Sequence, residues 1–300
     1  MADNGVTVMA PDAAVGDTGV INGITYTKRT ADQITPGNAN TTCTSGIESM
    51  RNLFIGDSNF NEDISSWDVS SVTVMAAMFH NARSFNGDIS HWDVSNVTLL
   101  DNMFYGAESF NGDINSWDVS NVTSMMGMFN GAKSFNSDLN DWDVSSVTNM
   151  DGMFRDAENF NGDINSWDVS NVTTMRTMFN SDTNTSEFNQ NLNNWDVGNV
   201  IDMSYMFRGA INFNGNISNW DVGNVTDMNM MFLGAGNFNQ EINYWNVGNV
   251  TNMDEMFRDA TNFNQDLSLW CVANIASEPS LFALNSALSN EHIPAWGSCP

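Results

Sequence analysis

Tryptophan recurs along this chain with a fixed period. Nine tryptophans, from Trp67 to Trp270, follow one another at steps of 25 residues, with a single step of 28 residues between Trp167 and Trp195. A unit of this length cannot bury its own apolar side chains, so neighbouring units must stack around a shared core. The period therefore predicts one elongated array, which presents a long surface rather than a catalytic pocket.

The apolar positions of the unit hardly change along the chain. Counting from each Trp, Phe lies at position −7, Ile or Leu at −3, Val at +2, and a Met-Phe pair at +11 and +12. The segment Phe110–Ile114 alternates apolar and polar residues, which is typical of a strand. Met125, Met128, Phe129 and Ala132 have the spacing of one helix face. The pattern predicts an α/β repeat solenoid with one short strand and one short helical segment in each 25-residue turn.

The repeat begins and ends inside the chain. We expect an N-terminal segment and cap over residues 1–40, an array of about eight to nine units over 41–276, and a C-terminal cap over 277–300. Cysteine is too sparse for a disulfide framework, so that either the two cysteines near the C-terminal end form one bridge or all three are inert thiols. The three are Cys43, Cys271 and Cys299.

The charge balance excludes several classes of partner. The chain has 36 acidic and 9 basic residues, which leaves a net charge of −27. Proteins bind nucleic acids and anionic membranes through clusters of Lys and Arg, whereas the acidic surface of this chain repels both partners. No apolar stretch approaches the roughly 20 residues of a membrane span. We therefore expect no nucleic-acid partner and no direct membrane insertion.

One family has a repeat of this kind. The run from Phe110 to Phe129, Phe-Asn-Gly-Asp-Ile-Asn-Ser-Trp-Asp-Val-Ser-Asn-Val-Thr-x-Met-x-x-Met-Phe, closely resembles the BspA-like leucine-rich-repeat surface proteins of bacteria, whose repeat is a domain of unknown function in surface lipoproteins. The resemblance covers about residues 41–276. It implies a leucine-rich-repeat-like solenoid on a secreted or surface-anchored protein associated with adhesion, without catalytic activity. We expect an extracellular or cell-surface location and a monomeric module of a longer protein, because this chain shows no signal or anchor.

An asparagine follows the repeated Phe in every unit. Stacked amides donate and accept along such a column and satisfy backbone groups, so we expect a structural ladder, with a ligand role as the alternative. The column consists of Asn61, Asn86, Asn111, Asn136, Asn161, Asn189, Asn214, Asn239 and Asn264.

Two acidic columns flank the tryptophans, at positions −4 and +1. If turns lie about 4.8 Å apart, neighbouring carboxylates repel by roughly 1 kcal/mol in water. Either each Asp accepts hydrogen bonds from the turn that follows it, or Ca²⁺ binds the carboxylates together with Asn amides and backbone carbonyls. The EF-hand spacing is absent. The candidate ligands are Asp63, Asp68, Asp88, Asp93, Asp113, Asp118, Asp138, Asp143, Asp163 and Asp168.

Position +13 varies from unit to unit, which is expected of an exposed side. Aromatic and Arg side chains are frequent anchors of binding interfaces, so one interpretation is a recognition stripe. The alternative is a solvated side with a few weak ion pairs. The stripe comprises His80, Tyr105, Arg155, Arg208 and Arg258.

These patterns favour binding over catalysis. Three scattered histidines, with no nucleophile elbow and no phosphate loop, give no basis for an enzyme. The first hypothesis is a surface module for adhesion that binds an unknown protein or glycan ligand. The second is a spacer or stalk, with Ca²⁺ as a possible stabilising ion. A threonine column at position +6, interrupted by Ile201, raises an ice-binding surface as a distant third.

Overall fold

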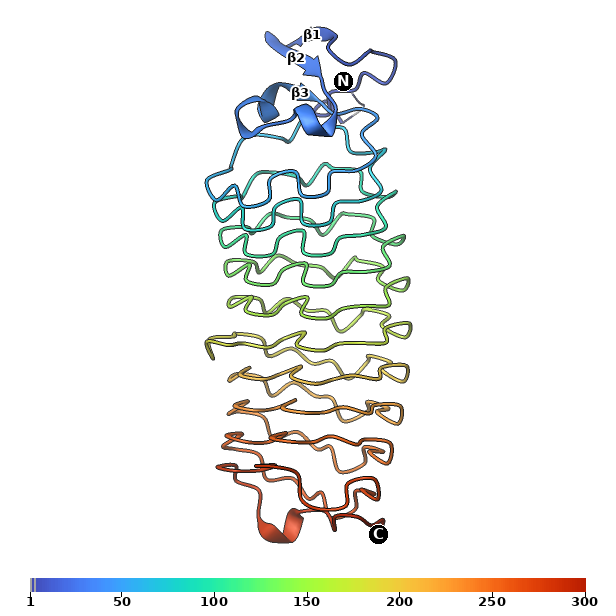
Figure 1. The fold of residues 1–300 in the computed structure, drawn as a ribbon, viewed down its shortest axis with the longest axis vertical. Coiled ribbons are helices and arrows are strands. Elements are labelled where there is room, and N and C mark those ends of the chain that lie inside the picture. The colour runs from blue at the N-terminus through green and yellow to red at the C-terminus, as the bar shows by residue number, and fades with distance from the viewer. Residues whose placement is uncertain (1, 3) are drawn as a thin grey trace.

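The protein is a long column of stacked turns. The computed structural model describes residues 2 and 4–300, and the chain winds from an N-terminal cap at one end of the column to a C-terminal cap at the other (Figure 1). Each repeat makes one turn and lies directly on the turn before it. The stacking that the 25-residue period predicts is therefore the organising feature of the molecule.

Regular secondary structure is confined to the two ends among the described residues. In the N-terminal cap, β1 pairs with β2 in antiparallel fashion and β2 pairs with β3 in parallel (Figure 1). The remaining elements are short 3₁₀ segments, two in the N-terminal cap and one near the C-terminus. The elements are β1 (Thr18–Ile21), β2 (Ile24–Lys28), η1 (Ala31–Gln33), η2 (Pro36–Thr41), β3 (Thr42–Cys43) and η3 (Asn290–His292).

Consecutive turns are joined by backbone hydrogen bonds on one side of the column. The residue at position +7 of each turn forms a single-residue parallel bridge with its counterpart in the next turn, from Ser49 to Asn252. Beyond the bridge, alternate N–H groups donate to the following turn, as Phe79 N does to Met103 O over 2.9 Å. The bridges fix the register, so that equal positions of successive repeats form columns.

The prediction of an α/β solenoid is wrong, and the helical segment is the first reason. Met78 N donates to Met75 O over 3.1 Å and Ala82 N donates to Phe79 O over 2.9 Å, which are the bonds of successive β-turns. Ala77 and Asn81 have φ values of 55° and 58°, a left-handed conformation that interrupts any α-helix. Successive turns of three residues place apolar side chains at the same i, i+3, i+4, i+7 spacing as a helix does. The apolar spacing therefore predicted a helix where the structure has turns.

The predicted strand at positions −7 to −3 is absent as well. The N–H of Asn111 donates to the side-chain Oδ1 of Asn86 over 2.8 Å, where a strand would donate to a backbone carbonyl. An amide side chain thus takes the place of a ladder partner, and the alternation of buried and exposed residues persists without a sheet. The array consists of turns and extended coil, with no leucine-rich-repeat strand and helix among its described residues.

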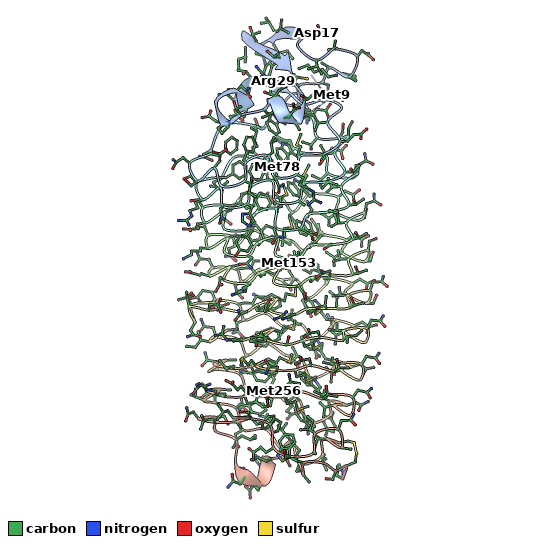
Figure 2. The ribbon with its side chains drawn as sticks, viewed as in Figure 1. Met9, Asp17, Arg29, Met78, Met153 and Met256 are labelled. Atoms are coloured by element: carbon green, nitrogen blue, oxygen red, sulfur yellow. A yellow bond between two sulfur atoms is a disulfide. The ribbon has the colours of Figure 1, made fainter. Side chains whose placement is uncertain are left out.

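Aromatic and methionine columns fill the core. Phe79 stacks on Phe85 of the same turn at 3.9 Å between ring centroids and on Phe104 of the next turn at 5.6 Å, and this pattern continues along the array. Methionines such as Met153 lie along the middle of the column, fully buried (Figure 2). Each repeated Trp from Trp67 to Trp270 also donates its indole N–H toward the previous turn, as Trp142 Nε1 does to Ile114 O over 2.9 Å. Burying a side chain of this size contributes several kcal/mol, about 25 cal/mol for each Å² of apolar surface.

Candidate binding surfaces

The asparagine column links every turn to the next. The side-chain Oδ1 of each Asn from Asn61 to Asn239 accepts the backbone N–H of the following Asn, over 2.7–3.0 Å. At the end of the array, Ser289 N donates to Asn264 Oδ1 over 3.1 Å and continues the series into the C-terminal cap. These amides are exposed, yet each satisfies a backbone donor that has no strand partner. The asparagine column therefore holds successive turns together.

The aspartates at position +1 cap the turn that follows them. Asp118 Oδ1 accepts the N–H of Ser120 over 3.1 Å and its hydroxyl over 2.6 Å. The bonds from the Ser120 hydroxyl and N–H lower the pKa of Asp118, and Ser170 has the same effect on the pKa of Asp168. The corresponding bonds form at Asp68, Asp93 and Asp143.

The aspartates at position −4 behave in a similar way. Asp88 Oδ1 accepts the hydroxyl of Ser90 over 2.7 Å and its N–H over 3.0 Å, and these bonds lower the pKa of Asp88. Asp138 instead accepts the N–H of the adjacent Leu139. Asp63, Asp113 and Asp163 accept the backbone N–H of the residue two positions later, as Asp88 does.

Each candidate carboxylate is therefore held by a partner in its own turn, and Asp68 also accepts the hydroxyl of Ser45 from the preceding turn. In residues 2 and 4–300, no group of three or more His, Cys, Asp or Glu side chains gathers as metal ligands do. The ten candidate calcium ligands are spread along the column, one pair to each turn, and each has a local hydrogen bond that offsets its charge.

The side chains of the proposed recognition stripe are engaged with their neighbours. All five are half-buried. Arg155 and Arg208 form ion pairs with Asp182, which lies between them in the intervening turn. His80 stacks on Tyr105 with ring centroids 4.5 Å apart.

The last residue of the stripe has acidic partners in its own turn. Arg258 pairs with Glu255 over 2.8 Å and with Asp259 over 3.3 Å. In the structure His80 contacts Tyr105, Arg155 and Arg208 share the carboxylate of Asp182, and Arg258 has partners of its own.

Sequence reasoning missed three surface residues, one beside the stripe and two at position −1. Asp182 belongs to the three-residue insertion after Phe179, and the column pattern gave it no place. Tyr244 and Leu269, at position −1, are 81% and 63% exposed. Every earlier turn has Ser, His, Asp or Asn at that position, so the change of residue type was the available signal.

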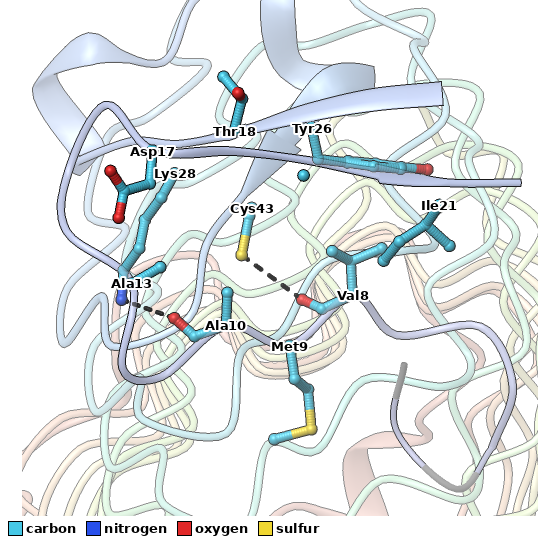
Figure 3. Close-up of a pocket in the computed structure, with 11 residues that line it drawn as sticks. Val8, Met9, Ala10, Ala13, Asp17, Thr18, Ile21, Tyr26, Lys28 and Cys43 are labelled. Atoms are coloured by element: carbon cyan, nitrogen blue, oxygen red, sulfur yellow. Dashed lines mark hydrogen bonds between the residues drawn. The ribbon is translucent and has the colours of Figure 1, made fainter. Parts of the chain in front are cut away.

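The N-terminal cap contains a small cavity. About 160 Å³ in volume, it lies between the segment before β1, the β1–β2 hairpin and Cys43 (Figure 3). Lys28 Nζ donates to Ala10 O over 2.8 Å and so ties the leading segment to β2, and the buried Cys43 thiol lies 3.7 Å from Val8 O. The lining is mostly apolar, which suits packing between the segments better than chemistry.

A disulfide between Cys271 and Cys299 ties the C-terminal cap to the last turn. Among the described residues, no helix has the length and apolar character needed to cross a membrane.

These observations define a tandem-repeat protein, built from stacked turns of one size around an aromatic core. A family model described as a Mycoplasma protein of unknown function, DUF285, matches residues 24–139, 112–187 and 181–296. The chain belongs to this family. No curated protein matches the chain.

Proposed function

We propose that this protein is a non-enzymatic surface module that binds a protein or glycan ligand in adhesion. The observation that carries the proposal is the division of each turn into constant and variable side chains. The buried columns repeat Phe, Trp, Val and Met, while positions +9 and +13 change from turn to turn on one side of the column. Side chains that vary around a constant core are what a recognition surface requires.

Two further features support a surface location. The repeat resembles that of the BspA-like surface proteins, which are associated with adhesion. The disulfide between Cys271 and Cys299 is a bond that persists in oxidising, extracellular environments. We therefore assign the chain to an extracellular or cell-surface protein, as a monomeric module within a longer one.

The test is a binding screen of the whole chain against immobilised matrix proteins and glycans. The variant Arg155→Ala/Arg208→Ala removes both ion-pair partners of Asp182 on the variable side. Its control, Arg83→Ala/Lys133→Ala, changes the net charge equally and breaks two exposed pairs at position +16, with Glu108 and Glu158.

A ligand held by the variable side is released by the first variant and retained by the second. Equal binding by both variants would remove the variable side from the proposal. A wild-type chain that binds nothing in either part of the screen would overturn the proposed function itself.

A structural spacer is the second candidate, and the uninterrupted core favours it. The Phe and Trp columns run from Phe54 to Trp270 without a gap, which gives a stiff column suited to holding another domain away from a surface. Thermal unfolding in EDTA, Mg²⁺ and Ca²⁺ tests whether ions contribute. A rise in midpoint specific to Ca²⁺ would assign ions to the acidic columns, because ligands that bind only the native state raise its stability. Equal responses to both cations leave the local turn hydrogen bonds as the support of the carboxylates.

A further inference from the structure

We infer that the exposed Tyr244 and Leu269 form a platform for a neutral polysaccharide chain. This inference rests on the proposed binding function and names a ligand class and a site for it. The site lies on the side of the column formed by positions −6 to −1, away from the variable positions +9 and +13.

Burial along one turn shows how the platform is presented. Phe238, Ile242 and Trp245 point into the core, each at most 3% exposed. The exposed residues of the same segment, including Tyr244, therefore face outward. In the next turn the corresponding residue is Leu269, and the turns are held in register by the bond from Trp270 Nε1 to Ile242 O over 3.1 Å. An aromatic ring and an aliphatic side chain thus occupy one column at successive turns.

The fold does not require these side chains. Ser66, Ser116 and Ser166 occupy the same position in earlier turns, and their turns stack in the same way. A Tyr exposed to 81% buries little of its ring, so it contributes little to folding. Two large exposed side chains in successive turns, where the earlier turns carry polar residues, are therefore a departure from the repeat that a ligand would explain.

The surroundings of the ring match a sugar. Position −6 carries amide side chains at Asn239 and Asn264, and position −4 carries carboxylates at Glu241 and Asp266, all exposed. The Oδ1 atoms of the two amides accept hydrogen bonds from the following turn, so the amides offer their Nδ2 groups as donors, while the carboxylates accept. Donors and acceptors together are what a ligand with many hydroxyl groups needs. The C–H face of a pyranose ring is complementary to the electron-rich face of an aromatic ring.

Charge and size restrict the ligand further. The net charge of −27 and the exposed carboxylates Glu241 and Asp266 repel sulfated or carboxylated glycans, which leaves neutral chains. Two side chains form too small an apolar centre for a protein interface, which usually buries about 800 Å² on each partner. An extended polymer instead lies along the flat side and contacts successive turns.

In the experiment, isothermal titration calorimetry measures the binding of cellohexaose, chitohexaose and laminarihexaose to the whole chain. At least one of these neutral hexasaccharides is expected to bind. Tyr244→Ser, which restores the residue of earlier turns, should weaken binding about tenfold, the value of one aromatic stacking contact. Asn194→Ser changes the same position two turns earlier and should leave affinity unchanged, and equal melting temperatures show that both variants fold.

Three results would overturn the inference: no hexasaccharide binds, Tyr244→Ser binds as the wild type does, or Tyr244 is required only for binding to a protein. The proposed function is judged separately. A wild-type chain that binds a ligand in the screen independently of Tyr244 retains the function and loses this site, whereas a chain that binds nothing loses both.

Discussion

The sign of one glycine substitution distinguishes the observed turns from the helix that the spacing suggests. Gly131 has φ of 69°, and a Cβ added there would meet Gly106 Cα at 3.5 Å, an ordinary contact. Space is therefore available, and the effect of Gly131→Ala is a backbone effect. The left-handed conformation costs an L-residue roughly 1–2 kcal/mol, while the lower entropy of the unfolded chain returns about 0.4–1 kcal/mol. We expect a net loss of about 1 kcal/mol, whereas in a helix the same change would stabilise by about 1 kcal/mol.

The reverse substitution provides an internal check. Ala77 has φ of 55°, so Ala77→Gly relieves the left-handed strain and should be neutral or stabilising, although Gly inside a helix is destabilising. Gly37→Ala is the control: no atom lies within 4 Å of its added Cβ and its φ is not in the left-handed region, so the stability should rise or stay level.

Urea unfolding monitored by tryptophan fluorescence measures all three variants, because the tryptophans report from every turn of the array. A more stable Gly131→Ala variant together with a less stable Ala77→Gly variant would refute the turn geometry.

Three further predictions concern the carboxylates and the disulfide. The hydroxyl and N–H of Ser170 lower the folded-state pKa of Asp168. The stability gained from the ionised carboxylate is therefore complete above the pKa of the unfolded state and is lost as the pH falls through the pKa of the folded state. Ser170→Ala should flatten the acid end of a curve of unfolding free energy against pH. Burial raises the pKa of Asp151, so its ionised form destabilises the fold at neutral pH. This penalty vanishes as the pH falls through the raised pKa. Asp151→Asn should therefore raise the urea midpoint at neutral pH and leave it unchanged in acid. Cys271→Ser removes the bridge to Cys299, which spans a separation of 28 residues, and should destabilise the C-terminal end by about 3 kcal/mol. Hydrogen exchange of the last turn measures this loss, and unchanged protection there would contradict the prediction.

The repeat and its inward positions could be predicted from the sequence, because stacking like on like requires the same residue at the same position. The Phe, Trp, Val and Met positions are buried throughout the array. The local conformation could not be predicted from apolar spacing, since a chain of turns and a helix place apolar residues equally well.

The better signal lay in position +14. Gly106, Gly131 and Gly234 occur there with Asn81 and Asp156, and these residue types tolerate positive φ, as all five show. A helix would place such residues at its end rather than in the middle of its apolar pattern.

The candidate sites were predictable where their partners lie in the same unit. The bond from Ser120 to Asp118 spans two residues, so the acidic columns could be interpreted as turn caps. The pairing of Arg155 and Arg208 with one aspartate could not be anticipated, because Asp182 lies in the only insertion of the array. Pairing across turns depends on register, which an insertion changes locally.

The arrangement separates what holds the array together from what it presents. Between turns, cohesion comes from backbone bonds, the asparagine column and stacked rings, and a core side chain contacts the turns on both sides of it: Trp142 donates to Ile114 and stacks on Trp167. A change there disturbs three turns at once. An outward position such as that of Tyr244 takes no part in these contacts, so its residue is free to change without weakening the column. Departures from the repeat at outward positions are therefore the places where recognition can be acquired, which makes Tyr244 and Leu269 more informative about the ligand than any of the repeated columns.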